Sequence, residues 1–301
     1  MPELPEVTTI VNDLNKKAVG RVIKKVNGDT PKLIKPFKTD VFEKMIKDLS
    51  FDHFERKAKF IIGYLKRVNK EQPEWALIWH MKMTGHLLFR DERGEDEKQK
   101  NFFADPKNQF IRLRIDFADG THLDFSDLRK FGSLRVVKPD EVENHPALRG
   151  LGPDALKYKW TFREFNSRLK KRTIPIKKAI MDQKLIAGIG NIYADEILWE
   201  SKINPLKPAN KLSKEESEKI LISINSILKR AVRARGTSID DFRDASGKKG
   251  NFGKLLNVYQ RKGEKCLRCG TKIVRISVGG RGTHFCPNCQ KYKVKTTKKG
   301  S

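Results

Sequence analysis

DQKLIAGIGNIYADEIL, residues 182–198, places a glycine-rich turn between two apolar segments of helical period. Pro175 suits the start of the first helix, and Asn191 stands where the second helix begins. Backbone N–H groups at such a turn can hold a phosphate, and Asn191 adds a side-chain donor. Ordinary packing of a helical hairpin is the alternative. A dinucleotide-binding fold is excluded because no strand pattern precedes the glycines.

Downstream of this turn, the chain carries four cysteines in two pairs, spaced C-x2-C-x16-C-x2-C: Cys266, Cys269, Cys286 and Cys289. This spacing predicts a zinc site with four thiolate ligands. The zinc is structural because four thiolates leave no position open for a water molecule. A module this short has little core of its own, so it depends on the metal. Two disulfides are the alternative reading of the same cysteines.

The whole chain is strongly basic, with 64 Lys and Arg against 37 Asp and Glu in 301 residues, a formal net charge of +27. Such a charge predicts salt-sensitive attraction to a polyanion, first of all a nucleic acid. A ribosomal or other RNA-bound protein would look similar. The sequence shows neither a secretory signal nor an apolar run long enough to span a membrane, so we expect no membrane partner.

Upstream, the pattern is helical over residues 3–18 and then strand-like to about residue 137. Several short strands with turns between them predict a β-sandwich, and Ala118–Thr121 reads as a hairpin turn. The expected fold is α+β and multidomain, a β-sandwich flanked by helices and followed by a helical domain and the zinc module. The polar segment 91–109 reads as a mobile loop, and 236–254 as a flexible one.

Changes in pattern suggest the following divisions of the chain: an N-terminal β-sandwich domain at 2–137, a linker at 138–160, a helical domain at 161–254, the zinc module at 255–290 and a basic tail at 291–301.

The chain begins Met1-Pro2-Glu3-Leu4-Pro5-Glu6. Removal of Met1 would make Pro2 a free secondary amine, and an α-amino group has a pKa of roughly 7.7–8.0, against about 10.4 for lysine. A neutral amine of this kind attacks an electrophilic sugar carbon and gives an iminium. Glu3 can supply or remove the proton. With Met1 attached, Pro2 is an amide nitrogen and cannot react in this way, and proline after methionine is also common without meaning.

Two short segments, His80–Gly85 and Asp127–Gly132, suggest a wedge for a base stack. Apolar side chains inserted between base steps open and kink a duplex. Met83 and Phe131 would otherwise be core residues. Lys59 enters a predicted strand and could point into a site or lie on the surface, and taken alone it favours the surface. Arg281 lies among glycines at the expected tip of the hairpin that joins the cysteine pairs, where it can approach a phosphate. A solvated charge in a basic module is the alternative.

Taken together, these segments resemble one family over essentially the whole chain, Pro2 to Gln290: bacterial formamidopyrimidine-DNA glycosylase, also called 8-oxoguanine DNA glycosylase/AP lyase. The motifs PELPEV, DLRKFG, DQKLIAGIGNIYADEIL and GRGTHFCPNCQ occur in the family's order. The resemblance implies excision of oxidised purines from duplex DNA through a Schiff base, followed by β,δ-elimination. It also implies a helix–two-turn–helix domain, one structural zinc ion and a bacterial, cytoplasmic, nucleoid-associated monomer.

The resemblance further implies roles for individual residues. Pro2 is similar to the nucleophile, Glu3 to the proton donor and acceptor, and Glu6 to an acid that supports the site. Lys59 corresponds to the lysine of base excision and β-elimination, and Arg281 to the arginine of phosphate contact and δ-elimination. Asn191 matches a phosphate ligand, and the residues that fill the gap left by the flipped lesion correspond to Met83, Arg129 and Phe131. The damaged base would lie under a loop near residues 236–254.

Some positions depart from the family pattern. No histidine stands in Lys107–Phe110, the loop at 91–105 is longer, and Leu128 replaces a frequent proline. Arg172 is the expected DNA contact before the helical hairpin, although Arg168, Lys170 and Lys171 compete for that role. Two alternative functions stay open at this point. One is an endonuclease VIII-like enzyme for oxidised pyrimidines, and the other is a catalytically silent protein that binds damaged DNA.

Overall fold

The computed structural model describes residues 1–28, 33–34, 37–91, 97–239 and 241–292. The chain forms two compact units. The first contains Met1–Gly150 and Ala231–Lys254, and the second Leu151–Arg230 and Leu255 to the C-terminus. By its contacts, Ala231–Lys254 thus belongs with the β-rich unit, although its sequence placed it with the helical segment. The predicted domain boundaries stay predictions, and most of the predicted tail lies outside the described residues.

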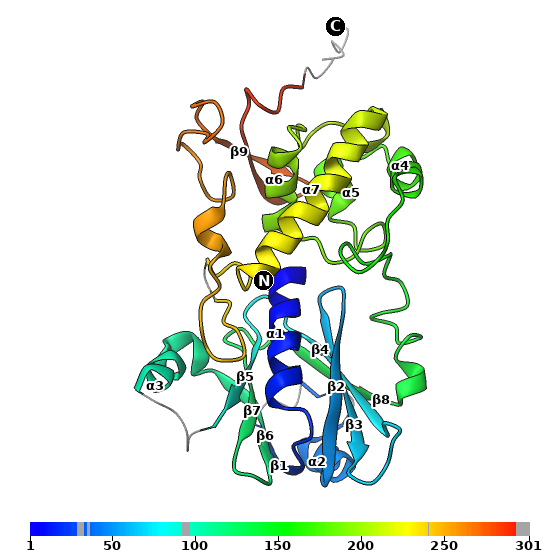
Figure 1. Ribbon diagram of the computed structural model, residues 1–301, viewed down its shortest axis with the longest axis vertical. Coiled ribbons are helices and arrows are strands. Elements are labelled where there is room, and N and C mark those ends of the chain that lie inside the picture. The colour runs from blue at the N-terminus through cyan, green and yellow to red at the C-terminus, as the bar shows by residue number, and fades with distance from the viewer. Residues whose placement is uncertain (29–32, 35–36, 92–96, 240, 293–301) are drawn as a thin grey trace, which may run out of the picture. The chain divides into compact units, whose positions relative to one another are not determined.

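The first unit is the predicted β-sandwich (Figure 1). One antiparallel sheet has the order β1-β6-β7-β5, and the other has the order β2-β3-β4-β8. The strands are β1 (Ile23–Gly28), β2 (Leu49–Lys57), β3 (Phe60–Arg67), β4 (Trp75–His80), β5 (His86–Arg90), β6 (Ile111–Phe117), β7 (His122–Ser126) and β8 (Ser133–Val137). The predicted turn at Ala118–Thr121 joins β6 to β7, with Gly120 at φ 85°.

Helix α1 (Leu4–Lys17) follows the predicted helical pattern closely. Its apolar side chains recur at helical spacing and are buried: Leu4, Val7, Ile10, Val11 and Leu14. Pro5 lies in the first turn, where its missing N–H costs nothing, and Lys16 and Lys17 lie in the last turn, where they complement the helix dipole. A second helix, α2 (Thr39–Ile46), buries Phe42 and Ile46 in the same core.

The predicted mobile loop at 91–109 is wrong in its second half. Helix α3 (Glu97–Ala104) and the short 3-10 helix η1 (Pro106–Asn108) form there, before β6 begins. Phe103 is buried, and the Phe102 and Phe103 rings lie against the cationic groups of Lys248 and Arg90, contacts that the polar composition of the segment does not reveal. The predicted flexible loop at 236–254 is also wrong in part. Phe242 and Ala245, which follow α7, are buried in the sandwich core.

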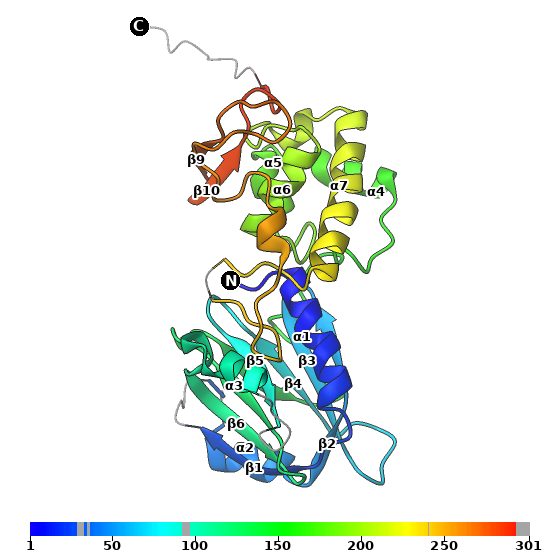
Figure 2. The same cartoon turned by 60° about the vertical axis from the view of Figure 1, so that its left-hand side comes forward.

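The second unit is mostly helical. Its helices are α4 (Phe162–Lys170), α5 (Ile176–Ile180), α6 (Asn191–Glu200) and α7 (Lys214–Arg233), whose last residues belong to the first unit. The zinc module follows with the hairpin β9 (Val274–Val278) and β10 (Arg281–Phe285), which is drawn beside α6 in Figure 2. Short 3-10 helices complete the chain: η2 (Pro139–Glu141), η3 (Ala209–Lys211) and η4 (Phe252–Leu255).

Candidate active site and DNA interface

Strand register gathers the predicted site residues of the first unit at one end of the sandwich. Val19 bridges Phe51 and Asn15 bonds to Phe54, so β2 runs toward the N-terminal end of α1. The β2–β3 turn, which contains Lys59, therefore lies at the end where Pro2 and Glu3 stand (Figure 1).

The wedge segments reach the same end through the other strands. His80, the last residue of β4, pairs with Phe60 and with Ser133, the first residues of β3 and β8. The two predicted wedge segments are the connections that leave β4 and enter β8, so both lie at this end.

The N-terminus is fixed by a buried carboxylate. Glu6 accepts a hydrogen bond from the Glu3 N–H at 2.8 Å with one oxygen and from the Thr237 N–H at 2.7 Å with the other. Glu3 and Glu6 are almost fully buried, Pro2 is buried as well, and Met1 is exposed. Glu6 therefore ties the start of α1 to a segment far along the chain. Thr237 was missed from sequence, because a backbone donor leaves no residue-type signal.

Lys59 is buried, so the interpretation of this lysine as a surface residue is wrong. It lies in the two-residue turn between β2 and β3, after Ala58 at φ 53°. The charge of Lys59 contributes to the lowered pKa of His80. Burial, together with the nearby charges of Lys82 and Lys59, lowers the pKa of His80 to about 3, and the ring is neutral at physiological pH.

Met83, Arg129 and Phe131 meet on the surface of the first unit. Met83 and Phe131 are 43% and 52% exposed, so they are not core residues. The Arg129 guanidinium lies 4.6 Å from the centroid of the Phe131 ring and donates to Met83 Sδ at 3.1 Å. Large apolar side chains that stand out of a surface beside a stacked arginine are suited to entering a base stack.

Buried Asp127 organises this group, and no role was predicted for it. Its carboxylate accepts from the Gly132 N–H at 2.7 Å, from the Arg129 N–H at 3.2 Å and from the Thr84 hydroxyl. These bonds close the turn Asp127–Gly132 against the Thr84 segment. An aspartate directly after a buried strand and before a run of turn residues was the available signal.

In the second unit, Asn191 and Arg281 are brought together at the hairpin. Asn191 is the first residue of α6, and its side-chain amide donates to Gly282 O at 3.2 Å. Gly279 and Gly280 both have positive φ and make the two-residue turn, so exposed Arg281 is the first residue of β10. Arg281, Lys178 and Met181 line an open hollow of about 350 Å³.

A fully buried ion pair fixes this arrangement, and its residues were not singled out from the sequence. Lys177 of α5 reaches Asp195 of α6 at 2.7 Å and also donates to Gly282 O at 3.1 Å and to the Thr283 hydroxyl at 2.9 Å. Asp195 accepts from the His284 N–H at 2.8 Å. One lysine and one aspartate therefore fasten β10 to both helices of the predicted turn.

Arg172 follows α4 and lies 3.3 Å from Asp182. It shares an open hollow of about 600 Å³ with Arg168, Lys171 and Lys184. The four basic side chains thus surround one cavity, and the geometry does not single out Arg172 as the residue that contacts DNA.

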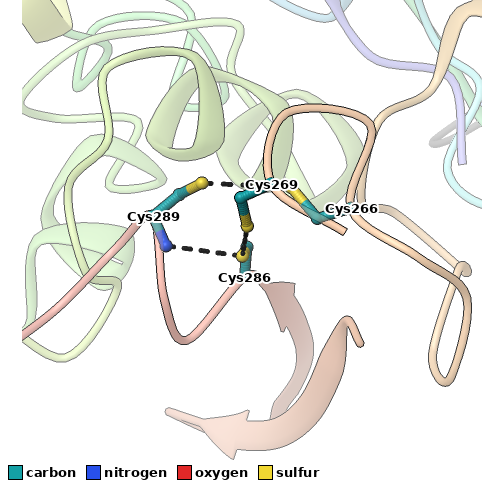
Figure 3. A group of neighbouring side chains, drawn as sticks. All are labelled: Cys266, Cys269, Cys286 and Cys289. Carbon is teal, nitrogen blue, oxygen red and sulfur yellow. Dashed lines mark hydrogen bonds between the residues drawn. The ribbon is translucent and has the colours of Figure 1, made fainter. Parts of the chain in front are cut away.

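The four cysteine sulfurs lie within 4.8 Å of one another (Figure 3). Tetrahedral zinc with Zn–S bonds of about 2.3 Å spaces its sulfurs at roughly 3.8 Å. The Cys269–Cys286 and Cys266–Cys289 pairs are 3.4 and 4.0 Å apart, which fits this geometry and is too long for disulfide bonds. The Trp199 indole donates to Cys266 Sγ at 3.4 Å. The cluster is the predicted site for one structural zinc ion.

None of the helices in the described part of the chain combines the length and the apolar character needed to cross a membrane.

Comparison with known families matches three consecutive parts of the chain. Residues 1–134 match the formamidopyrimidine-DNA glycosylase N-terminal domain, and residues 151–243 match the formamidopyrimidine-DNA glycosylase H2TH domain. Residues 263–291 match the zinc finger found in FPG and IleRS. The order of the three matches is the order in which the motifs occur.

Similar proteins cover nearly the whole chain. Formamidopyrimidine-DNA glycosylase of Desulfitobacterium hafniense is 38% identical over 96% of this chain and 100% of its own, and that of Bacillus cereus is 36% identical over 96% and 99%. Lactococcus lactis Fpg bound to DNA with an abasic site superposes with a TM-score of 0.84 at 32% identity, covering 97% of this chain and 100% of that one. With matched models spanning most of its length, the chain belongs to the formamidopyrimidine-DNA glycosylase family.

Proposed function

We propose that this protein is a bifunctional DNA glycosylase/AP lyase that excises oxidised purines, including 8-oxoguanine and formamidopyrimidines, from duplex DNA. The assignment of oxidised purines as the substrate class rests on the membership of this chain in the family. Lactococcus lactis Fpg has been solved with DNA that contains an abasic site and, as a mutant, with Fapy-dG DNA, each at a TM-score of 0.84. The observation that carries the mechanism is the position of the N-terminus, at the same end of the sandwich as the exposed Met83, Arg129 and Phe131.

The chemistry begins at the Pro2 nitrogen after Met1 is removed. Its lone pair attacks C1′ of the damaged nucleotide, the glycosidic bond breaks, and the base leaves with a proton. The sugar ring opens to an iminium, which accepts electron density as the 3′ and then the 5′ phosphate is eliminated. Water finally hydrolyses the iminium and frees Pro2. Each step moves protons but requires no redox partner.

Glu3 and Lys59 are the proton carriers in this proposal. Both are buried at the reacting end of the unit, where desolvation strengthens electrostatic interactions. Glu3 protonates the opening sugar, and Lys59 supports base loss and β-elimination. Glu6 is a positioning residue, because its buried carboxylate accepts from the Glu3 and Thr237 N–H groups and so fixes the Glu3 backbone.

The other predicted residues hold the DNA. Met83, Arg129 and Phe131 fill the gap left by the flipped nucleotide, and this occupancy repays the few kcal/mol that unstacking costs. Asn191 and Arg281 bind backbone phosphates, Arg281 also serves δ-elimination, and Arg172 adds a phosphate contact. The basic surface attracts the duplex from solution. The protein acts as a monomer in the bacterial cytoplasm on nucleoid DNA.

Borohydride trapping tests the nucleophile. Added during reaction with duplexes that contain 8-oxoguanine, borohydride reduces the iminium and leaves a covalent protein–DNA adduct. We expect the adduct with the protein whose Met1 has been removed. A matched protein with residues left in front of Pro2 should bind the same duplex without forming an adduct. An adduct from this blocked protein would show that another amine is the nucleophile, and Lys59 would be the first candidate.

Lesion class is tested with the same trap. Lactococcus lactis Fpg has also been solved with DNA that contains an oxidised pyrimidine, so binding alone does not separate the two lesion classes. Adduct yield should be higher on 8-oxoguanine and formamidopyrimidine duplexes than on a thymine glycol duplex. The reverse ranking would favour the endonuclease VIII-like activity. Binding without any adduct would favour the catalytically silent protein.

A further inference from the structure

Within the first unit, the segment from Phe102 to Asn108 packs against the loop of residues 241–250. We call the former the clamp and the latter the 241–250 loop. The clamp comprises the end of α3 and all of η1. The loop follows the Gly236–Ser238 stem, where Thr237 contacts Glu6.

The central contact is an ion pair between Arg243 of the loop and Asp105 of the clamp. Two guanidinium nitrogens of Arg243 reach the same Asp105 oxygen at 2.9 and 2.7 Å. The Arg243 side chain is only 4% exposed, and a third nitrogen donates to Phe242 O at 2.8 Å. Asp105 in turn accepts the Lys107 N–H at 2.9 Å, which shapes η1. A buried charge of this kind is costly unless its partner stays in place.

At a second contact, Gly247 brings the loop backbone close to Asn108 in a conformation that a side chain would strain. The Asn108 side-chain amide donates to Phe102 O at 2.7 Å and to Gly247 O at 3.2 Å, and its oxygen lies 2.9 Å from His86 Nε2. A Cβ at position 247 would lie 2.8 Å from the Asn108 nitrogen, and the residue has φ 75°. The loop backbone is therefore fitted to Asn108.

The opposite side of the loop is fastened to α1. Arg235 bridges Asp244 of the loop at 2.7 Å and Asp13 of α1 at 2.5 Å. Lys17 donates to the Ser246 hydroxyl at 2.5 Å. The backbone of Phe89 in β5 also donates to Ala245 O at 2.8 Å. Clamp, loop and helix thus form a continuous set of contacts that ends on the helix carrying Pro2 and Glu3.

We infer that the clamp holds the 241–250 loop in its folded position on α1 before DNA binds, and that Asp105 and Arg243 are positioning residues for lesion DNA. The second part of this inference, the role of Asp105 and Arg243 in binding lesion DNA, rests on the proposed function. A loop that must be ordered during binding lowers the apparent affinity by the fraction of molecules in the competent state. The clamp removes that cost because the loop is already fixed by buried contacts.

Asp105→Ala tests the clamp by leaving buried Arg243 without this carboxylate. In the protein free of DNA, amide exchange of residues 244–250 should become faster by at least about tenfold, the size of a lost charge-assisted hydrogen bond. The affinity for an 8-oxoguanine duplex should fall by at least about threefold, with kcat at saturating DNA nearly unchanged. If Asp105→Ala fails to fold, Asn108→Ser is the second variant. It keeps the ion pair but removes the Asn108 amide contact to the loop, and it should change exchange and affinity in the same direction.

The matched control is Glu74→Ala, which breaks the more exposed Arg67–Glu74 pair of the same unit at 2.8 Å. It should change neither loop exchange nor affinity. Unchanged exchange in Asp105→Ala, or faster exchange without loss of affinity, would overturn the inference. Equal effects of Glu74→Ala would do the same. If the parent protein binds lesion DNA but gives no borohydride adduct, the proposed function fails. The exchange of the loop amides and the affinity for DNA would still test whether the clamp holds the loop.

Discussion

The N-terminal site and the zinc hairpin are held in place by different means. The N-terminal site lies on α1, whose apolar face belongs to a core that continues through both sheets of the sandwich. In the zinc module, the β9–β10 hairpin and the cysteine pairs adjoin a small apolar cluster around Trp199, and this cluster includes Cys266 and Cys286 themselves. Hydrophobic burial fixes the first region, whereas metal ligation and polar contacts fix the second.

This difference determines how strongly each region is destabilised when one contact is removed. Removing one polar partner from the N-terminal site leaves the core intact, so the loss should be local. Removing zinc or the buried charge under β10 removes much of what holds the hairpin. Changes to the hairpin should therefore have larger effects than changes to the N-terminal site.

Metal removal should unfold the zinc module and spare the sandwich. Structural zinc contributes on the order of 10 kcal/mol in small zinc-finger peptides, more than so small a core can replace. We expect Cys286→Ser, or chelation, to abolish exchange protection of the amides of residues 263–291 and to weaken DNA binding. Amides of β2, β3 and β4 should keep their protection. Equal loss of protection in both regions would show that the sandwich also depends on the metal.

Lys177→Met should have the next largest effect, again confined to the second unit. It leaves Asp195 charged, fully buried and without its lysine, a change that typically costs about 3–5 kcal/mol. Urea unfolding measures the free energy, and exchange of the β10 amides locates the damage. Lys178→Met is the matched control because Lys178 is exposed one residue further along α5. Similar losses in both variants would refute a special role for the buried pair.

Residue pattern sufficed for several parts of this structure. The short strands, the turn at Ala118–Thr121, helix α1 and the four-cysteine site all follow from local periodicity and spacing. These features depend on neighbours in sequence, which the pattern records directly.

The parts that sequence missed depend on pairings between segments that have no spacing motif to mark them. Glu6 meets Thr237, Lys177 meets Asp195 and Asp105 meets Arg243, and in each case the pairing exists only after the chain has folded. For Lys59, local pattern alone favoured the surface, since a lysine at a hairpin turn is usually exposed, and only the family resemblance placed it in the site. The polar segment before β6 was misread because Phe102 and Phe103 find their partners on β5 and on the 241–250 loop.

Glu6→Gln should affect the N-terminal site by a smaller amount. The replacement directs an amide NH₂ at one of the two backbone N–H donors that the carboxylate now accepts, with a cost of about 1–3 kcal/mol. Adduct formation should slow with little change in affinity for undamaged duplex, because Glu3 loses its fixed position. Glu71→Gln, at an exposed position of the same unit, is the control. An unchanged rate would mean that the apolar face of α1 alone fixes the site.

The smallest effect concerns pH and His80. Its pKa is about 3 in the folded protein, because of burial and then Lys82 and Lys59, against 6.5 ordinarily. The unfolded chain therefore binds the extra proton between these values, and stability falls as pH decreases from 6.5. The slope is at most about 1.4 kcal/mol per pH unit. His80→Asn should flatten the urea-unfolding profile between about pH 3 and 6.5, the range bounded by the two pKa values. An unchanged profile would mean that His80 accepts a proton in the folded state, and that burial beside Lys59 does not keep the ring neutral.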